Sequence, residues 1–382
     1  MEKIIFLSAG EYSADLWGAD LLRELSLPAF GVGGENLKKQ GLQVLYPMEE
    51  VQWGGVFEIL PKLPRIKRVL RNLTEVILQR RPSALVLIDL PDFHFMLAER
   101  VKKRINIPVI HYVSPTVWAW RPGRIKRVKK LVDLELLIYP FEREIYRRWN
   151  IPHCFVGHPG MERVKPEISR KEFTRIYGSE NFITILPGSR PMEIKNHMPT
   201  LLEFVRLFRE RNPQITVFLA VAPTVKEMLM KYPMEGIISV EEHRYSAMAY
   251  AKVVLSASGT ATLETAFLQT PLIVFYKLLP LTYFVLKPLV KLEKYSIVNI
   301  LAGREVAKEL FQGEFTPENL LRETEKILGY RELQEEIRGE FSRIREMFPK
   351  APASKIAAKS ILSLLEGGPG RLDEVCRETG IV

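Results

Sequence analysis

The chain has 382 residues, a length that suits two ordinary domains better than one small core. Hydrophobic residues make up 47% and charged residues 26%, a globular composition that excludes a disordered chain. No uninterrupted apolar run approaches the roughly 20 residues of a membrane-spanning helix. The first residues also lack the basic and apolar regions of a signal peptide. We therefore expect a soluble cytoplasmic protein.

The balance of charge is basic, with 55 Lys+Arg against 45 Asp+Glu and a net charge of +10 at pH 7. Such a surface attracts nucleic acid, phosphorylated small molecules or an anionic membrane. No helix-turn-helix, RRM or zinc pattern is present, so nucleic acid is not expected as a partner. Two cysteines, Cys154 and Cys376, cannot build a disulfide framework or a multi-cysteine zinc site. We expect neither a metal nor a cofactor.

Strands and helices alternate along the first 160 residues. Short apolar runs predict strands that are buried on both faces, and segments of helical periodicity follow them. In chain order we expect strand 3–9, helix 15–25, strand 28–32, helix 66–80, strand 84–89, helix 95–103 and strand 108–113. This alternation indicates a doubly wound α/β fold with a parallel sheet.

The pattern restarts after about residue 165. We expect strand 182–186, helix 198–211, strands 216–221, 251–256 and 272–275, and a helical tail over 332–366 that two prolines interrupt. Two open α/β domains in tandem predict a ligand cleft between their carboxyl-end surfaces. The apolar segment 275–292 carries three lysines and two prolines, so we interpret it as buried core or a dimer contact.

The sequence SGTATLE follows a buried strand and opens a helix. Gly259 lets the backbone approach a ligand closely. Ser258, Thr260 and the N–H groups of the first helical turn then predict an anion site. Glu264 is placed to bond a sugar hydroxyl. An ordinary capped helix start is the simpler interpretation.

The sequence PGSR also follows a buried strand of the second half. Gly188 and Ser189 predict a tight turn, and Arg190 offers a guanidinium fork suited to phosphate oxygens. A simple ion pair between Arg190 and Glu193 is the alternative. Because PGSR and SGTATLE leave neighbouring strand ends, together they favour a diphosphate site.

The sequence IDLPDF places Asp89 at the carboxyl end of an apolar strand, facing the expected cleft. A carboxylate there can deprotonate a sugar hydroxyl as it attacks. Asp92 is the second candidate, weighted lower because it can instead cap the next helix. His158 ends a further strand, and a structural role is the simpler interpretation of a single histidine.

The sequence SAGEYSAD forms a strand-to-helix turn with Gly10, Glu11 and Ser13. It lacks the lysine of a Walker motif and a full GxGxxG pattern. We interpret it as the lining of an acceptor site, with a plain helix cap as the alternative.

Basic and aromatic residues gather between residues 111 and 130. Six of the ten residues from Arg121 to Lys130 are basic, and two tryptophans precede them. Such a segment suits an anionic membrane interface, with a solvated helix face as the alternative. The residues that we expect to face the membrane are Trp118, Trp120, Arg121, Arg124, Lys126 and Arg127.

Several motifs together resemble a known family. SAGEYSAD, GVGGENLKKQGL, IDLPDF, HYVSPTVWAWR, YPFERE, FVGHP, ILPGSR, SGTATLETA and VNILAGREVAKELFQ occur in the order found in lipid A disaccharide synthases, from about residue 5 to 320. The resemblance implies a GT-B fold, with two Rossmann-like domains. It implies inverting transfer of 2,3-diacylglucosamine from UDP-2,3-diacylglucosamine to lipid X, giving the β-1,6 disaccharide 1-phosphate and UDP. Peripheral association with the inner membrane and a homodimer with exchanged C-terminal segments are also implied.

The resemblance further implies roles for domains and residues. Residues 1–165, completed by helices in 345–382, would take lipid X and face the membrane, and residues 166–344 would bind the UDP-sugar. Asp89 resembles the general base and Glu11 belongs to the acceptor loop. The residues that resemble the UDP-sugar site are Gly188, Ser189, Arg190, Ser258, Gly259, Thr260, Glu264, Asn299, Glu309 and Gln312.

Two positions depart from the family pattern, since Ala14 and Val298 replace its usual glycine and proline. Both substitutions lie at predicted turns, so we expect them to affect the local backbone conformation and not the catalytic chemistry. The alternatives are another GT-B UDP-sugar enzyme, such as an N-acetylglucosaminyltransferase or a UDP-N-acetylglucosamine 2-epimerase, and a non-catalytic binder of anionic lipid.

Overall fold

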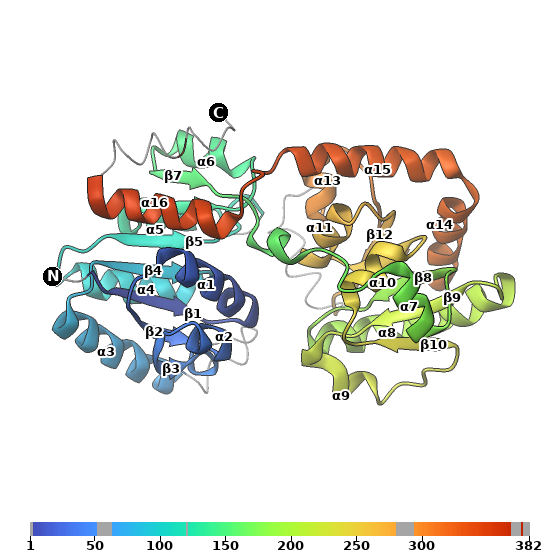
Figure 1. Ribbon diagram of the computed structural model, residues 1–382, viewed down its shortest axis with the longest axis horizontal. Helices are drawn as coiled ribbons and strands as arrows, with labels where there is room; N and C mark the ends of the chain where they lie inside the picture. Colours follow the sequence, from blue (N-terminus) through green and yellow to red (C-terminus); the bar gives the residue numbers. More distant parts are fainter. Residues whose placement is uncertain (1–2, 52–62, 120, 280–293, 368–375, 377–382) are drawn as a thin grey trace. The chain divides into compact units, whose positions relative to one another are not determined.

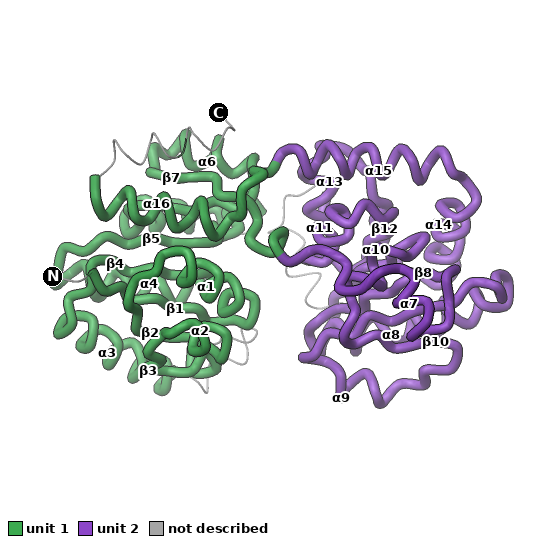
Figure 2. The backbone as a smooth tube through the Cα atoms, viewed as in Figure 1, with its two compact units in different colours: residues 1–162, 348–382 green, residues 163–347 purple. Residues whose placement is uncertain are grey.

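The computed structural model describes residues 3–51, 63–119, 121–279, 294–367 and 376. The chain divides into two compact units (Figure 2): unit 1 comprises residues 1–162 and 348–382, and unit 2 comprises residues 163–347. Trp120 and most of the apolar segment 275–292 lie outside the described residues.

Unit 1 contains a parallel sheet whose strands, within the described residues, follow the order β3-β2-β1-β4-β5-β6-β7 (Figure 1). The central strands β1 and β4 are buried at every position, as expected for a parallel sheet with helices on both faces. The order reverses between β1 and β4, the switch point at which doubly wound sheets bind ligands. The strands are β1 Ile5–Ala9, β2 Ala29–Gly33, β3 Gln43–Pro47, β4 Ala84–Ile88, β5 Val109–Tyr112, β6 Leu134–Leu137 and β7 His153–Phe155.

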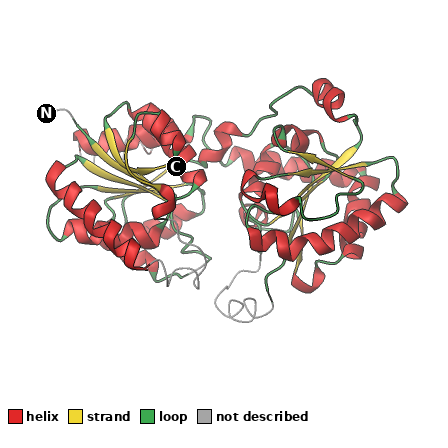
Figure 3. Ribbon diagram, turned by 90° about the horizontal axis from the view of Figure 1, so that it is seen from below, coloured by secondary structure: helices red, strands yellow, loops and turns green. Residues whose placement is uncertain are grey.

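Helices lie on both faces of this sheet (Figure 3). They are α1 Tyr12–Leu25, α2 Glu35–Lys39, α3 Leu63–Arg80, α4 Pro91–Lys102, α5 Arg124–Leu131, α6 Glu142–Arg148 and α16 Ala353–Gly367. One glycine is sterically required in the sheet, because a Cβ at Gly31 would lie 1.9 Å from the carbonyl oxygen of Leu7 on the neighbouring strand.

The C-terminal helix α16 returns to unit 1 and packs against α1. Ala357 and Ile361 of α16 are fully buried in the same apolar cluster as Leu21 of α1. Beyond the helix, Cys376 forms a disulfide with Cys154 of β7. Residues from both ends of the sequence therefore contribute to the hydrophobic core of unit 1.

Unit 2 repeats the arrangement, with strand order β10-β9-β8-β11-β12-β13 within the described residues. Its strands are β8 Phe182–Leu186, β9 Thr216–Ala220, β10 Ile237–Val240, β11 Val254–Ala257, β12 Leu272–Tyr276 and β13 Lys308–Phe311. Its helices are α7 Arg170–Tyr177, α8 Pro191–Arg211, α9 Lys226–Leu229, α10 Arg244–Tyr250, α11 Thr260–Phe267, α13 Ile297–Ala302, α14 Pro317–Gly329 and α15 Arg331–Glu346. The expected parallel, doubly wound α/β architecture is confirmed in both units.

Two helices begin well before the predicted residue. Helix α4 starts at Pro91 rather than residue 95, and α8 starts at Pro191 rather than residue 198. Proline suits the first position of a helix because its missing N–H has no partner there. Helix α8 also carries Pro199 in its interior, the residue near which the prediction began the helix. None of the described helices combines the length and the apolar character needed to cross a bilayer.

Candidate active site

Asp89 directly follows β4 and leaves the sheet in a strained conformation. Its amide still donates to the carbonyl of Tyr112 at 2.8 Å, so the strand ladder ends here. Asp89 and Leu90 then both adopt left-handed backbone angles, with φ of 56° and 48°. Such angles cost about 1–3 kcal/mol for each non-glycine residue and concentrate at functional sites.

Two buried histidines, which sequence analysis did not identify, hold this turn. His94 Nδ1 lies 2.6 Å and His111 Nε2 lies 3.3 Å from the backbone carbonyl oxygen of Asp89. Both histidines are fully buried. Each stands alone in an apolar segment, so its spacing carried no signal of a site.

Asp92, the second carboxylate, is bound to arginine rather than capping α4. The residue that caps α4 is Leu90, and the Asp92 carboxylate accepts a hydrogen bond from Arg124. A second arginine, Arg121, lies 3.6 Å from the same oxygen. Two arginines therefore contact the carboxylate of Asp92.

The loop of Gly10, Glu11 and Ser13 lies against the Asp89 turn. A Cβ at Gly10 would come within 2.4 Å of the end of the Leu90 side chain, which would have to shift to admit it. Glu11 begins α1, and its carbonyl accepts the amide of Asp15 at 2.8 Å. The structure thus brings the predicted acceptor loop next to the predicted base.

The PGSR loop after β8 is already bonded to a carboxylate. Glu193 Oε2 accepts the amides of Ser189 at 2.9 Å and Arg190 at 3.2 Å, and Gly188 adopts a φ of 125°. The guanidinium of Arg190 lies 3.5 Å from Glu193 Oε1, yet its side chain is 73% exposed. The ion pair considered from the sequence is present, and the exposed guanidinium stays accessible to an anion.

The SGTATLE loop after β11 opens α11. Gly259 is the N-cap residue, it is exposed together with Thr260, and no atom lies within 4 Å of a Cβ placed on it. The amide of Ser258 donates to Phe275 at 2.9 Å, which fixes the loop to β12. Because β8 and β11 are neighbouring strands, PGSR and SGTATLE leave adjacent strand ends.

Glu264 lies one turn further along α11. Its carboxylate accepts a hydrogen bond from the Tyr245 hydroxyl at 3.2 Å. Burial raises the pKa of Glu264, although the charge of Arg244 and the bond from Tyr245 act in the opposite direction. The hydroxyl of Tyr245, which sequence analysis did not identify, therefore lies beside the carboxylate of Glu264, the group predicted to bond a sugar hydroxyl.

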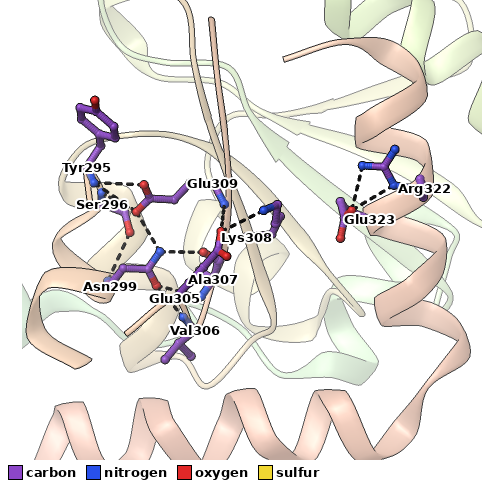
Figure 4. A network of polar contacts seen from close by, with 10 residues as sticks. All are labelled: Tyr295, Ser296, Asn299, Glu305, Val306, Ala307, Lys308, Glu309, Arg322 and Glu323. Atoms are coloured by element: carbon purple, nitrogen blue, oxygen red, sulfur yellow. Dashed lines mark hydrogen bonds and ion pairs between the residues drawn. The ribbon is translucent and has the colours of Figure 1, made fainter. Parts of the chain in front are cut away.

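Asn299 and Glu309 form a network that braces the segment before α13 (Figure 4). The Asn299 amide donates to Ala307 and Glu309 and accepts from the amides of Val306 and Ala307, at 2.7–2.9 Å. Asn299 is fully buried, and the four hydrogen bonds of its side-chain amide are all made within the chain. Its contact with a UDP-sugar stays a prediction.

Two further predicted residues also bond the backbone. Glu309 accepts the amides of Tyr295 at 3.0 Å and Ser296 at 2.9 Å. With the oxygen and nitrogen of its side-chain amide exchanged, Gln312 donates to the carbonyl oxygen of Leu278 at 3.3 Å and accepts from the amide of Leu278 at 3.2 Å. Both side chains are half-buried, so they shape this region through the backbone that they hold.

The basic segment only partly matches the expectation of a membrane-facing surface. Lys126, Lys129 and Lys130 of α5 are exposed, and so is Arg121 before the helix. The side chain of Arg124 is only 15% exposed and pairs with Asp92.

The other two described members of this segment also contact the protein. Trp118 is half-buried and packs edge-on against Phe141, with ring centroids 5.1 Å apart. Arg127 lies over the ring of Phe95.

Among the described residues, no group of three or more His, Cys, Asp or Glu side chains is placed to hold a metal ion.

Comparison with known proteins decides the family. The sequence model described as lipid-A-disaccharide synthetase matches residues 5–350. The chain belongs to the lipid-A-disaccharide synthase family. The lipid-A-disaccharide synthase of Anaeromyxobacter dehalogenans (strain 2CP-1) is 37% identical over 373 residues, covering 94% of this chain and 97% of that protein. The enzyme of Myxococcus xanthus is 35% identical over 380 residues, covering 96% and 98%.

Solved structures share the fold at low sequence identity. A putative UDP-N-acetylglucosamine 2-epimerase from Listeria monocytogenes matches with a TM-score of 0.64 at 14% identity, covering 96% of each chain. The calicheamicin glycosyltransferase CalG4 matches with a TM-score of 0.61 at 13% identity, covering 98% of this chain and 99% of that one. These likenesses confirm the GT-B fold of the family and carry no argument for an epimerase activity.

Proposed function

We propose that this member of the lipid-A-disaccharide synthase family transfers 2,3-diacylglucosamine from UDP-2,3-diacylglucosamine to lipid X. The products are the β-1,6 disaccharide 1-phosphate and UDP. The observation that carries the proposal is the family match over residues 5–350, supported by 37% identity to a lipid-A-disaccharide synthase along nearly the whole chain.

We assign the acceptor chemistry to unit 1. Asp89 takes the proton from the 6-hydroxyl of lipid X, and that oxygen attacks the anomeric carbon of the donor sugar. The bond from this carbon to the UDP oxygen breaks on the opposite face, which inverts the configuration. The position of Asp89 at the end of a parallel strand, in a strained turn beside Gly10, supports this role.

We assign the nucleotide chemistry to unit 2. The exposed guanidinium of Arg190 and the free end of α11 at Gly259 and Thr260 bind the diphosphate. As the bond to the sugar breaks, negative charge grows on the leaving UDP. Fixed donors of this kind stabilise such charge, by about 2.7–4 kcal/mol for one donor in a measured oxyanion hole.

We further propose that the protein is cytoplasmic and binds the anionic face of the inner membrane through α5. Both substrates carry acyl chains, and α5 presents Lys126, Lys129 and Lys130 to solvent. A homodimer with exchanged C-terminal segments is the last part of the proposal. In that dimer the contacts between α16 and α1 would join two chains.

A thin-layer assay with UDP-2,3-diacylglucosamine and lipid X tests the reaction. We expect the disaccharide product from the wild type, and from Asp89→Asn a turnover lower by about 10²–10⁴-fold. UDP binding, measured by calorimetry, should be unchanged in that variant. Absence of product with the wild type would overturn the proposed function, and wild-type turnover in Asp89→Asn would remove Asp89 from the role of base.

A further inference from the structure

A buried chain of polar side chains crosses unit 1 beneath Asp89. Its members come from four elements: Ser8 from β1, His94 from α4, His111 from β5 and Glu135 from β6. Each of the four is 0% exposed. Burying polar side chains costs free energy unless each polar group forms a hydrogen bond. We therefore expect these four side chains to serve a specific role.

The hydrogen-bond partners fix the role of His94. Its Nδ1 faces the Asp89 carbonyl at 2.6 Å, and its Nε2 faces the Ser8 hydroxyl at 2.8 Å. A carbonyl only accepts, so Nδ1 carries the proton and Nε2 accepts from Ser8. Burial, together with the charge of His111, lowers the pKa of His94 to about 3, which keeps the ring in this neutral form.

The second histidine is held from the other side. His111 Nδ1 lies 2.7 Å from Glu135 Oε1, and its Nε2 lies 3.3 Å from the Asp89 carbonyl. The pairing of β5 with β6 places His111 and Glu135 opposite each other. Because the Asp89 carbonyl only accepts, Nε2 carries a proton, and Nδ1 shares a proton with the Glu135 carboxyl group. Burial opposes the charge on His111, but Glu135 and Asp89 raise its pKa overall.

The target of both rings is a single backbone oxygen. A carbonyl oxygen has two lone pairs, and the two imidazoles supply one donor to each. This oxygen belongs to the peptide between Asp89 and Leu90, the two residues with left-handed backbone angles. Fixing that peptide plane fixes the direction in which the Asp89 side chain leaves the turn.

We propose that His94 and His111 are positioning residues, which clamp the Asp89 carbonyl from two sides and so aim the Asp89 carboxylate at the acceptor hydroxyl. This inference rests on the proposed role of Asp89 as base. Ser8 and Glu135 orient the two rings. Misplacing a reacting group by about 1 Å can cost about 100-fold in rate, so the clamp is expected to act on turnover.

Two matched pairs of substitutions test the clamp. His94→Asn keeps a donor where Nδ1 stands, whereas His94→Gln moves the amide towards Ser8. His111→Gln keeps a donor where Nε2 stands, whereas His111→Asn withdraws it. With UDP-2,3-diacylglucosamine and lipid X, we expect His94→Gln and His111→Asn to lower kcat by about 10- to 100-fold, with KM for the UDP-sugar unchanged. The donor-keeping partners should stay within a few-fold of the wild type.

A double variant separates this inference from the role of Asp89. If His94 acts through Asp89, adding His94→Gln to Asp89→Asn should cause no further loss. Thermal unfolding and UDP calorimetry check that each variant is folded, and His153→Asn on β7 serves as a control for losing a half-buried histidine. Equal activity within each matched pair, or a full additional loss in the double variant, would overturn the clamp. Wild-type activity of Asp89→Asn alone would instead overturn the role of the base.

Discussion

The carboxylate of Glu193 lies 2.9 Å from the amide nitrogen of Ser189, inside the loop predicted to hold a diphosphate. The same oxygen accepts the next amide, and Tyr276 donates to the other oxygen at 3.2 Å. The backbone donors of this loop therefore already have an anionic partner. We therefore propose that this loop contacts a phosphate through the exposed side chain of Arg190.

Arg190→Ala is expected to weaken UDP binding. A hydrogen bond to a charged group contributes about 1.5–3 kcal/mol, so the dissociation constant should rise by about 10- to 100-fold. Calorimetry with UDP measures the change. Arg175→Ala is the matched control, because Arg175 pairs with Glu172 at the same i,i+3 spacing and is 78% exposed. Equal affinities of the two variants would show that Arg190 does not meet the diphosphate.

Reversing the charge of α5 is expected to reduce membrane binding. Each basic residue near an anionic surface contributes about 1 kcal/mol, so Lys126→Glu, Lys129→Glu and Lys130→Glu together should lower affinity by about 100-fold or more. Co-sedimentation with phosphatidylglycerol vesicles measures this, with phosphatidylcholine vesicles as the reference. The control carries Lys171→Glu and Lys231→Glu, two exposed positions of unit 2. Unchanged binding of the α5 variant would place the membrane contact elsewhere.

His158 is expected to make stability depend on pH. Its Nδ1 accepts the amide of Gly160 at 3.1 Å, and burial lowers the pKa of the ring to about 4 from 6.5. Between these values the unfolded chain binds the proton and the folded chain does not, so stability falls as pH falls. The full contribution, roughly 3 kcal/mol, is present above pH 6.5 and is lost towards pH 4.

His158→Asn tests this dependence, because asparagine retains an acceptor near Gly160 and does not titrate. Urea unfolding at about pH 5 and about pH 7 should show a smaller difference in the variant than in the wild type. His243→Asn, at a half-buried histidine of unit 2, should leave the wild-type difference in place. An equally steep dependence in His158→Asn would exclude His158 as its source.

The disulfide is expected to stabilise unit 1. Cys154 and Cys376 are separated by 222 residues, and such cross-links typically contribute about 2–5 kcal/mol to the free energy of unfolding. Cys376→Ser, or reduction of the wild type, should therefore lower the unfolding temperature. Reductant should not change Cys376→Ser further. A wild-type unfolding temperature in the variant would contradict the prediction.

The same bond reports on the exchange of C-terminal segments. In an exchanged dimer Cys376 would pair with Cys154 of the other chain, so a non-reducing gel would show a covalent dimer. A monomer band under those conditions, from protein that is dimeric in solution, would contradict the exchange.

Sequence patterns predicted the central strands of both sheets, but not β3, β6, β10 and β13, nor the first turns of α4 and α8. The apolar run 182–186 coincides with β8 because a buried parallel strand needs hydrophobic residues on both faces. The first turns of α4 and α8 carry proline and polar residues that bond the preceding loops, as Glu193 does, and so lack the apolar periodicity of a helix.

The candidate site residues that the sequence could suggest are those that lie at the ends of apolar strands. Asp89 could be selected because it ends an apolar strand, and its left-handed turn is consistent with a special role. His94 and His111 could not be selected from the sequence. A single histidine in an apolar segment does not differ in pattern from other buried positions, and its partners become visible only in the tertiary structure. For Asn299, only the tertiary contacts show that its side-chain amide is hydrogen-bonded within the chain.

Unit 1 is interrupted in the sequence by the whole of unit 2, and this order constrains synthesis. During synthesis, the first 162 residues leave the ribosome before helix α16, which covers α1. The 185 residues of unit 2 are synthesised before α16. Unit 2 is continuous, so it can fold as soon as it has emerged. A nascent chain stalled before residue 348 would thus carry a complete unit 2, whereas the apolar face of unit 1 that α16 covers would still be exposed.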